Sequence, residues 1–175
     1  IDGLLFIMQD AQITANDIAN IAIATYGPAV SITDRIDPKT PQECKFSMQY
    51  VLAHAAHYGS VRIEAFEAER MSDPAIQAML GQIDLSIDPA VDAEFPARRA
   101  AHVSITTKDG RQLTHYQPTR KGDPDLPLSD NELGAKFIEL TNPVLGGELT
   151  NSLLQKLWQL DNISLANALG FAVAT

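Results

Sequence analysis

Residues 103–116 of this chain are VSITTKDGRQLTHY, and they carry its clearest structural signal. Apolar Val103 and Ile105 alternate with polar neighbours, which is the pattern of a strand with one buried face. Asp109-Gly110 is a turn that β-hairpins favour, because glycine tolerates a positive φ. The stretch therefore predicts an antiparallel hairpin whose return strand runs from Arg111 to Tyr116.

Two more strands are expected upstream of this hairpin. Residues 18–26 form a short run rich in β-branched side chains that ends at Gly27-Pro28, and we interpret it as a buried strand. Residues 83–87 alternate as the hairpin does and predict another strand. At the start of the chain, apolar residues at helical spacing predict a helix whose packing partner lies elsewhere in the protein; they are Ile1, Leu4, Leu5 and Met8.

Capping signals predict the helices between these strands. Thr40-Pro41-Gln42-Glu43 is a capping box with proline at the first helical position, and we expect one helix from Pro41 to Tyr58, ended by Gly59. A shorter helix should run from Pro74 to Gly81 after the Ser72-Asp73 cap. This order of strands and helices favours an α+β fold, a two-layer sandwich with a four-stranded antiparallel sheet covered by helices.

A helical region is expected at the carboxyl end. Residues 119–128 are rich in proline, glycine and charge, and we interpret them as an ordered loop or a linker. Ser129-Asp130-Asn131-Glu132 is a second capping box, and two leucine-striped helices should follow it with Asn142-Pro143 between them. We therefore divide the chain into an α+β region, residues 1–128, and a helical appendage, residues 129–175.

Composition excludes several classes of function. The chain has 13 Lys and Arg against 22 Asp and Glu, a formal net charge of -9, which argues against nucleic-acid and anionic-membrane partners. Cys44 is the single cysteine, so an internal disulfide is impossible and a zinc site has no cysteine cluster to build on. These features favour the cytoplasm. The first residues resemble neither a signal peptide nor a translation start, so we expect the chain to begin within a longer protein.

The expected helix at 41–58 presents two faces. One stripe should cover the sheet and consists of Cys44, Met48, Val51, Leu52 and Ala55. The opposite side holds Phe46, Tyr50, His54 and His57, which is unusual for a face that meets only water. Three interpretations stay open: a solvated face, a contact with another domain or subunit, and direct contact with substrate. We favour the contact with another domain.

Several motifs resemble one known family. Residues 45–51, KFSMQYV, resemble the KFS-x-x-Y segment of MmgE/PrpD proteins. The resemblance continues in the family's order and spacing through Asp73-Pro74, Phe95-Pro96-Ala97-Arg98, Thr107-Lys108-Asp109-Gly110, Lys121-Gly122-Asp123-Pro124, Pro127-Leu128-Ser129, Glu132-Leu133 and Lys136-Phe137. It implies that this chain is the carboxyl-terminal, lid-like α+β domain of such a protein, and that the helices after residue 128 pack on an amino-terminal helical domain.

The resemblance also implies a chemistry. Family members dehydrate 2-methylcitrate, decarboxylate cis-aconitate or epimerise iminodisuccinate, without a cofactor, at the carbon next to a carboxylate. The complete protein is then expected to be a lyase or an isomerase, a homodimer, and an enzyme of a small di- or tricarboxylic acid. The family's basic motif, a Lys followed shortly by Pro and His, would lie just upstream of Ile1, and its other catalytic histidines would lie in the helical domain. The chain by itself is therefore expected to be inactive.

No residue of this chain is assigned a catalytic role, and neither a metal nor a cofactor is expected. The candidates for substrate binding or for the domain interface are Lys45, Ser47, Tyr50, His54, His57 and Lys121. Each has a structural alternative. Lys45 can lie along the helix edge with its charge in water, and Tyr50 can be a buried interface tyrosine. The spacing of His54 and His57 would suit a metal, but no third ligand is evident. Lys121 can line a cleft or belong to a rigid lead-in to the next helix.

A function of another class stays open for the whole chain. A non-catalytic binding or dimerisation module would also lack a catalytic constellation. The reading frame upstream of Ile1 distinguishes the two, because only the enzyme hypothesis requires an in-frame helical domain there.

Overall fold

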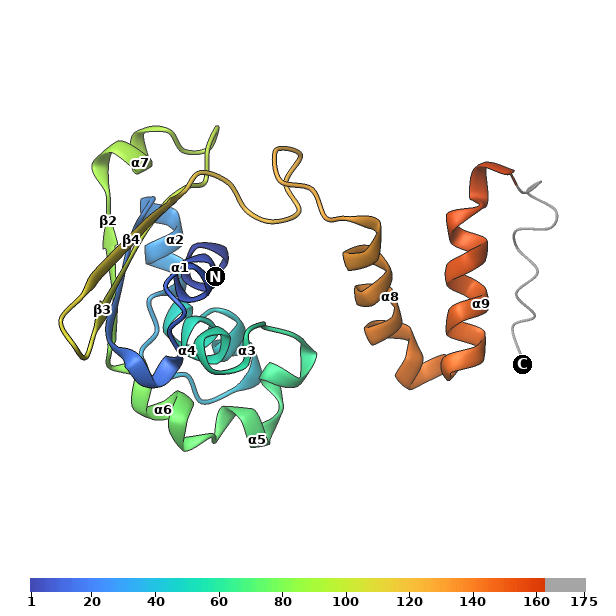
Figure 1. Cartoon of the computed structure of the whole chain (residues 1–175), viewed down its shortest axis with the longest axis horizontal. Helices are drawn as coiled ribbons and strands as arrows, with labels where there is room; N and C mark the ends of the chain where they lie inside the picture. Colours follow the sequence, from blue (N-terminus) through green and yellow to red (C-terminus); the bar gives the residue numbers. More distant parts are fainter. Residues whose placement is uncertain (163–175) are drawn as a thin grey trace. The chain divides into compact units, whose positions relative to one another are not determined.

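The computed structural model describes residues 1–162, and the chain divides into two compact units, Ile1–Leu126 and Pro127–Thr175. The first unit contains a four-stranded sheet and the second consists of helices within the described residues (Figure 1).

The sheet of the first unit has the order β2-β1-β3-β4. Its strands are β1 (Ile18–Thr25), β2 (Ile83–Ile87), β3 (Ala101–Thr107) and β4 (Gln112–Gln117). The predicted hairpin is confirmed, since β3 and β4 are antiparallel and the turn between them places Gly110 at φ +88°. β3 also runs antiparallel to β1.

One pair in the sheet departs from the expectation. β1 and β2 are parallel, with Ile21 opposite Ile83 and Ile23 opposite Leu85, so the sheet is mixed and the prediction of a purely antiparallel sheet was wrong. The physical reason is the long helical connection between these two strands, which carries the chain from the end of β1 back to the end of the sheet at which β1 begins. The α+β class and the four strands are confirmed.

Helices cover one face of this sheet (Figure 1). The helices of the first unit are α1 (Asp2–Asp10), α2 (Gly27–Thr33), α3 (Pro41–Lys45), α4 (Met48–Tyr58), α5 (Ala68–Met71), α6 (Pro74–Leu80) and α7 (Pro89–Ala93). Short 3-10 turns occur at Ala15–Asp17 and Ile63–Phe66. On β3, Val103 and Ile105 point into the core while His102 is exposed, which is the alternation that the sequence predicted.

The first helix belongs to this unit's own core. α1 packs against β3 and β4, and its Leu4 and Ile7 side chains are buried. The expectation that this helix lacks a packing partner was therefore wrong. The physical reason is that the apolar face of the hairpin needs a cover, and α1 supplies it.

The expected helix from Pro41 to Tyr58 is two helices. α3 ends at Lys45, and Ser47 is extended at φ -110° and ψ 109° before α4 begins. The Ser47 hydroxyl accepts a hydrogen bond from the Tyr50 amide at 3.1 Å, so this serine is a second helix cap. The capping box at Thr40 and the helix of Pro74–Leu80 are confirmed.

The second unit contains α8 (Asp130–Leu145), α9 (Gly147–Trp158) and a 3-10 turn at Leu160–Asn162. The capping box at Ser129 is confirmed. Asn142-Pro143 does not separate the two helices, because α8 continues through Pro143 and Gly146, at φ +75°, makes the turn. A proline near the end of a helix removes only one hydrogen bond, whereas glycine adopts the turn conformation without strain.

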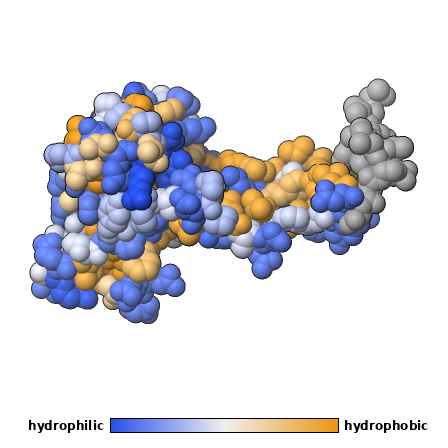
Figure 2. All heavy atoms as spheres, turned by 90° about the horizontal axis from the view of Figure 1, so that it is seen from above, coloured by the Kyte–Doolittle hydropathy of each residue, from blue (hydrophilic) through white to orange (hydrophobic). Residues whose placement is uncertain are grey.

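Apolar side chains are exposed on the second unit, where Figure 2 shows them in orange. Val144 is 82% exposed and Leu149 is 62% exposed. None of the helices that the structure describes is long and apolar enough to cross a membrane.

Candidate functional site

An apolar hollow of about 330 Å³ lies at one end of the sheet in the first unit. The start of α1, the end of β1, the start of β3 and one side of α4 form its walls. Its apolar lining comes mainly from Met48, Val51, Leu52 and Val103. Thr25 and Tyr26 lie where β1 ends, and Ile1 is also part of the lining.

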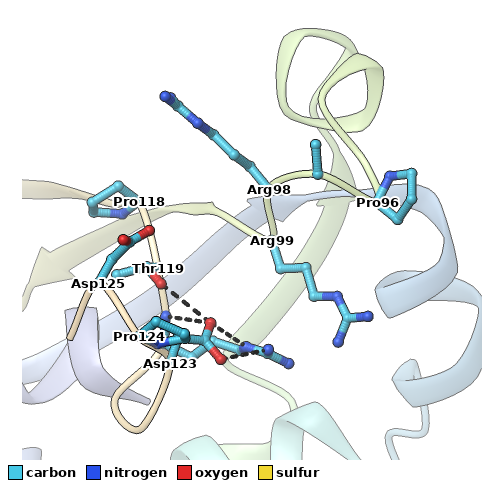
Figure 3. A pocket seen from close by; sticks show the side chains of 10 residues that line it. Pro96, Arg98, Arg99, Pro118, Thr119, Asp123, Pro124 and Asp125 are labelled. Atoms are coloured by element: carbon cyan, nitrogen blue, oxygen red, sulfur yellow. Dashed lines mark hydrogen bonds and ion pairs between the residues drawn. The ribbon is translucent and has the colours of Figure 1, made fainter. Parts of the chain in front are cut away.

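A second, more polar hollow of about 540 Å³ adjoins the first. It lies between the segment that enters β3 and the segment that leaves β4, and both hollows are lined by Arg99, Thr119 and Arg120 (Figure 3). The hairpin explains why these segments meet, because Ala101 pairs with Gln117 and so brings the residues before β3 next to those after β4. Two arginines that are distant in sequence thus stand at the boundary of a polar and an apolar space.

The arginines around the polar hollow differ in their charge partners. Arg120 forms a two-pronged ion pair with Asp123, at 2.7 Å and 3.0 Å, which raises the pKa of the arginine and lowers that of the aspartate. Arg98 lies 3.7 Å from the Glu94 carboxylate. Within residues 1–162 no carboxylate lies at ion-pair distance from Arg99. Its guanidinium carbon lies 6.0 Å from the centre of the Phe95 ring.

Lys45 and Lys121 are exposed in the structure. The Lys45 ammonium lies 5.5 Å from the centre of the Phe66 ring. The Lys121 amide donates a hydrogen bond to the Asp2 carboxylate at 2.7 Å, next to residues that line both hollows. Of the two lysines that the sequence suggested, Lys121 is therefore the one beside the hollows.

The remaining candidates lie on or beside α4, and three of them are buried. Ser47 donates a hydrogen bond to the Arg35 carbonyl at 2.5 Å, and the Tyr50 hydroxyl donates one to the Ala65 carbonyl. Burial raises the pKa of Tyr50 to about 12. His54 places its Nδ1 at 2.8 Å from the Ser60 carbonyl oxygen. Among the described residues, the Nε2 atoms of His54 and His57 are enclosed without a hydrogen-bond partner.

The expectation that one face of this helix awaits another domain was wrong for Tyr50 and His54. Both are at most 1% exposed within this chain. The physical reason is the break at Phe46 and Ser47, which changes the phase between α3 and α4, so that side chains assigned to an outer face point inward. Phe46 itself is 42% exposed. Substrate or interface roles for the candidate residues stay predictions.

Sequence reasoning missed Arg99 and Arg120. Both lie in irregular segments, so no periodic pattern marks them. The signal that could have found them is the hairpin, because its open end must bring residues just before β3 close to residues just after β4.

As for metals, residues 1–162 contain no group of three or more His, Cys, Asp or Glu side chains placed to hold an ion.

Residues 1–160 match a protein-family model described as the MmgE/PrpD C-terminal domain. The chain belongs to the MmgE/PrpD family. It is 28% identical to the cis-aconitate decarboxylase of Mus musculus over 145 residues, which are 81% of this chain and 30% of that protein. It is 31% identical to the 2-methylcitrate dehydratase of Cupriavidus necator over 105 residues, or 57% of this chain and 22% of that protein. The MmgE/PrpD chain described here thus spans less than a third of these relatives.

Proposed function

We propose that this chain is the α+β domain of a cofactor-independent lyase that acts on a small di- or tricarboxylic acid, at the carbon next to a carboxylate. Membership of the MmgE/PrpD family supports the proposal, as do relatives named for the decarboxylation of cis-aconitate and the dehydration of 2-methylcitrate. Loss of water and loss of carbon dioxide both begin by weakening a bond at that carbon. Epimerisation, by removal and return of a proton at the same carbon, is the isomerase version of the proposal.

The observation that carries the proposal is the pair Arg99 and Arg120 at the boundary of the two hollows. A small polycarboxylate has charged ends and a hydrocarbon centre, so it needs cationic groups beside an apolar surface. Arginine suits this task because its planar guanidinium binds a carboxylate through two hydrogen bonds. The chain as a whole is acidic, so a local concentration of arginines supports a site for an anionic ligand at this place.

The base that removes the proton would come from outside residues 1–162 in this proposal. The family's basic motif of Lys followed shortly by Pro and His, which the resemblance places just upstream of Ile1, would then lie beside the apolar hollow, since Ile1 lines it. Histidine and lysine are suited to general acid and base catalysis near neutral pH. In this proposal Lys121 faces the substrate. Lys45 and His57 face the helical domain. The three buried residues hold α4 in position; they are Ser47, Tyr50 and His54.

The exposed apolar side chains of α8 and α9 support a further part of the proposal. We expect them to pack on the helical domain of the same protein. The matched relative is long enough to hold such a domain, because the match covers 30% of its length. The complete protein is proposed to be a cytoplasmic homodimer.

The direct test is an assay of the complete protein with cis-aconitate and 2-methylcitrate. We expect release of carbon dioxide from the first or loss of water from the second, without added metal or cofactor. An iminodisuccinate assay tests the epimerase version. A folded protein that converts none of the three would contradict the proposal and favour a non-catalytic binding module.

A further inference from the structure

We infer that Arg99 binds a carboxylate group of the substrate and is the specificity-determining arginine of this domain. The inference rests on the proposed function for the identity of the ligand, a small polycarboxylate. It goes further because it separates Arg99 from the two neighbouring arginines and assigns the recognition to one side chain.

Arg99 differs from the two neighbouring arginines in its charge partners. Arg120 is paired with Asp123 through two hydrogen bonds, and Arg98 lies near Glu94. An anion that approached either arginine would compete with a carboxylate already present. Asp123 and Asp125 line the same polar hollow, but among residues 1–162 neither these nor any other carboxylate lies at ion-pair distance from Arg99, so it is the one arginine of this group without a direct charge partner. Coulomb attraction for an anion is therefore concentrated at Arg99.

Arg99 also differs from Arg98 in its position. Arg99 lines both hollows, whereas Arg98 lines only the polar one. Figure 3 shows the two side chains leaving the backbone in different directions. A carboxylate bound to Arg99 would leave the hydrocarbon part of the same molecule next to Val51 and Met48 in the apolar hollow. The guanidinium would then bind the carboxylate through charge-assisted hydrogen bonds while the apolar side chains contact the rest of the ligand.

The surroundings of Arg99 are ordered by contacts within the domain. The next residue, Ala100, is 2% exposed and its carbonyl accepts a hydrogen bond from the buried Thr25 hydroxyl at 2.7 Å. Phe95 stacks on Tyr26 with ring centres 4.8 Å apart, and the Arg99 guanidinium lies over the Phe95 ring. The backbone next to Arg99 is thus fixed before a ligand arrives, and the Phe95 ring gives the guanidinium a surface to lie over. A positioned arginine loses less conformational entropy on binding than a free one.

The test uses the complete protein and tricarballylate, a tricarboxylate that has neither a hydroxyl group nor a double bond to eliminate or decarboxylate across. Calorimetry measures its dissociation constant for the wild type and for Arg99→Gln, Arg99→Lys, Arg98→Gln and Arg111→Gln. Arg111 pairs with Asp109 at the turn end of the hairpin, so Arg111→Gln is the control for the change in net charge. Kinetics with the substrate that the protein converts then separate KM from kcat.

We expect Arg99→Gln to raise the dissociation constant for tricarballylate about 10-fold to 100-fold, because a hydrogen bond to a charged group contributes about 1.5 to 3 kcal/mol. Arg99→Lys should recover part of this loss, since it keeps the charge without the planar fork. The KM for substrate should rise by a similar factor with kcat changed less than about threefold. Arg98→Gln and Arg111→Gln should each stay within about twofold of the wild type.

Three results would overturn the inference. The first is a wild-type protein that does not bind tricarballylate at millimolar concentration. The second is an Arg99→Gln protein that binds it as tightly as the wild type does. The third is a loss of affinity in Arg98→Gln as large as that in Arg99→Gln. A protein that binds tricarballylate through Arg99 yet converts no substrate would keep the inference and contradict the proposed reaction. Unfolding midpoints of the variants show whether a loss of binding reflects a loss of folding, and Arg99 is exposed, so we expect none.

Discussion

The hydroxyl of Tyr50 donates a hydrogen bond to the backbone carbonyl of Ala65, in the 3-10 turn that follows α4. Tyr50 has no exposed surface, and the Phe66 ring lies 6.3 Å from its own ring. The bond therefore ties the central helix to the loop beneath it. Tyr50 belongs to the core of this unit and does not await a partner.

Tyr50→Ala should consequently destabilise this chain by about 3 to 5 kcal/mol, the usual cost of removing a large buried aromatic side chain. Tyr50→Phe should cost about 1 to 2 kcal/mol, because it keeps the ring and leaves the Ala65 carbonyl without its donor. Chemical denaturation of the isolated chain and of the complete protein measures both. A loss confined to the complete protein would show that Tyr50 contacts another domain after all.

Local signals explain which parts of this fold could be predicted. The hairpin, the caps at Thr40, Asp73 and Ser129, and the strand at residues 83–87 depend on neighbouring residues, and all were found. The parallel pairing of β1 with β2 depends on where a long connection returns, which no local pattern records. The predicted orientation of α4 was wrong because one extended residue, Ser47, interrupts a stretch whose sequence is compatible with a continuous helix.

The candidate site was harder to predict than the fold. Arg99 and Arg120 come together only through the register of β3 and β4, so their proximity is a tertiary property. Lys121 was found because it belongs to a family motif, and it does lie beside the hollows. Arg98 was also part of a motif, but that motif ended one residue before Arg99.

Gly110→Val should destabilise the chain by more than about 1 kcal/mol. Gly110 has φ +88°, a conformation that a β-branched residue adopts only under strain, although no atom would obstruct the new side chain. Gly81 is the matched control, since it has equal space and an ordinary φ of -74°. Urea denaturation of Gly110→Val and Gly81→Val compares the two, and equal costs would count against strain as the cause.

The pH dependence of stability should contain a contribution from Asp73. The Tyr58 hydroxyl and the Ala75 amide both donate hydrogen bonds to this carboxylate and hold its pKa below the usual value. A folded pKa below the unfolded one means that the carboxylate stabilises the fold above the unfolded pKa, and that this contribution is lost as pH falls through the folded pKa. The loss should therefore occur below about pH 4.

Tyr58→Phe tests this assignment, because it removes the donor with the largest effect on Asp73. The pKa of Asp73, followed by NMR of its carboxyl carbon, should rise toward the ordinary value. Asp17 is the internal control: its pKa is lowered by hydrogen bonds from Thr14 and should not move. An unchanged Asp73 pKa in the variant would contradict the role given to Tyr58.

Residues 1–175 alone should show no turnover, even if the complete protein is an active lyase. A general base must reach the proton that it removes. The histidines of α4 cannot serve as this base, because His54 is buried against Ser60 and the Nε2 of His57 is enclosed. The Lys45 ammonium lies over the Phe66 ring. Assays of the isolated chain with cis-aconitate, 2-methylcitrate and iminodisuccinate should give background rates, with the complete protein as the positive control. Turnover by the isolated chain would mean that a base within this unit acts on the substrate, and His102, which is exposed on β3, would be the first to replace.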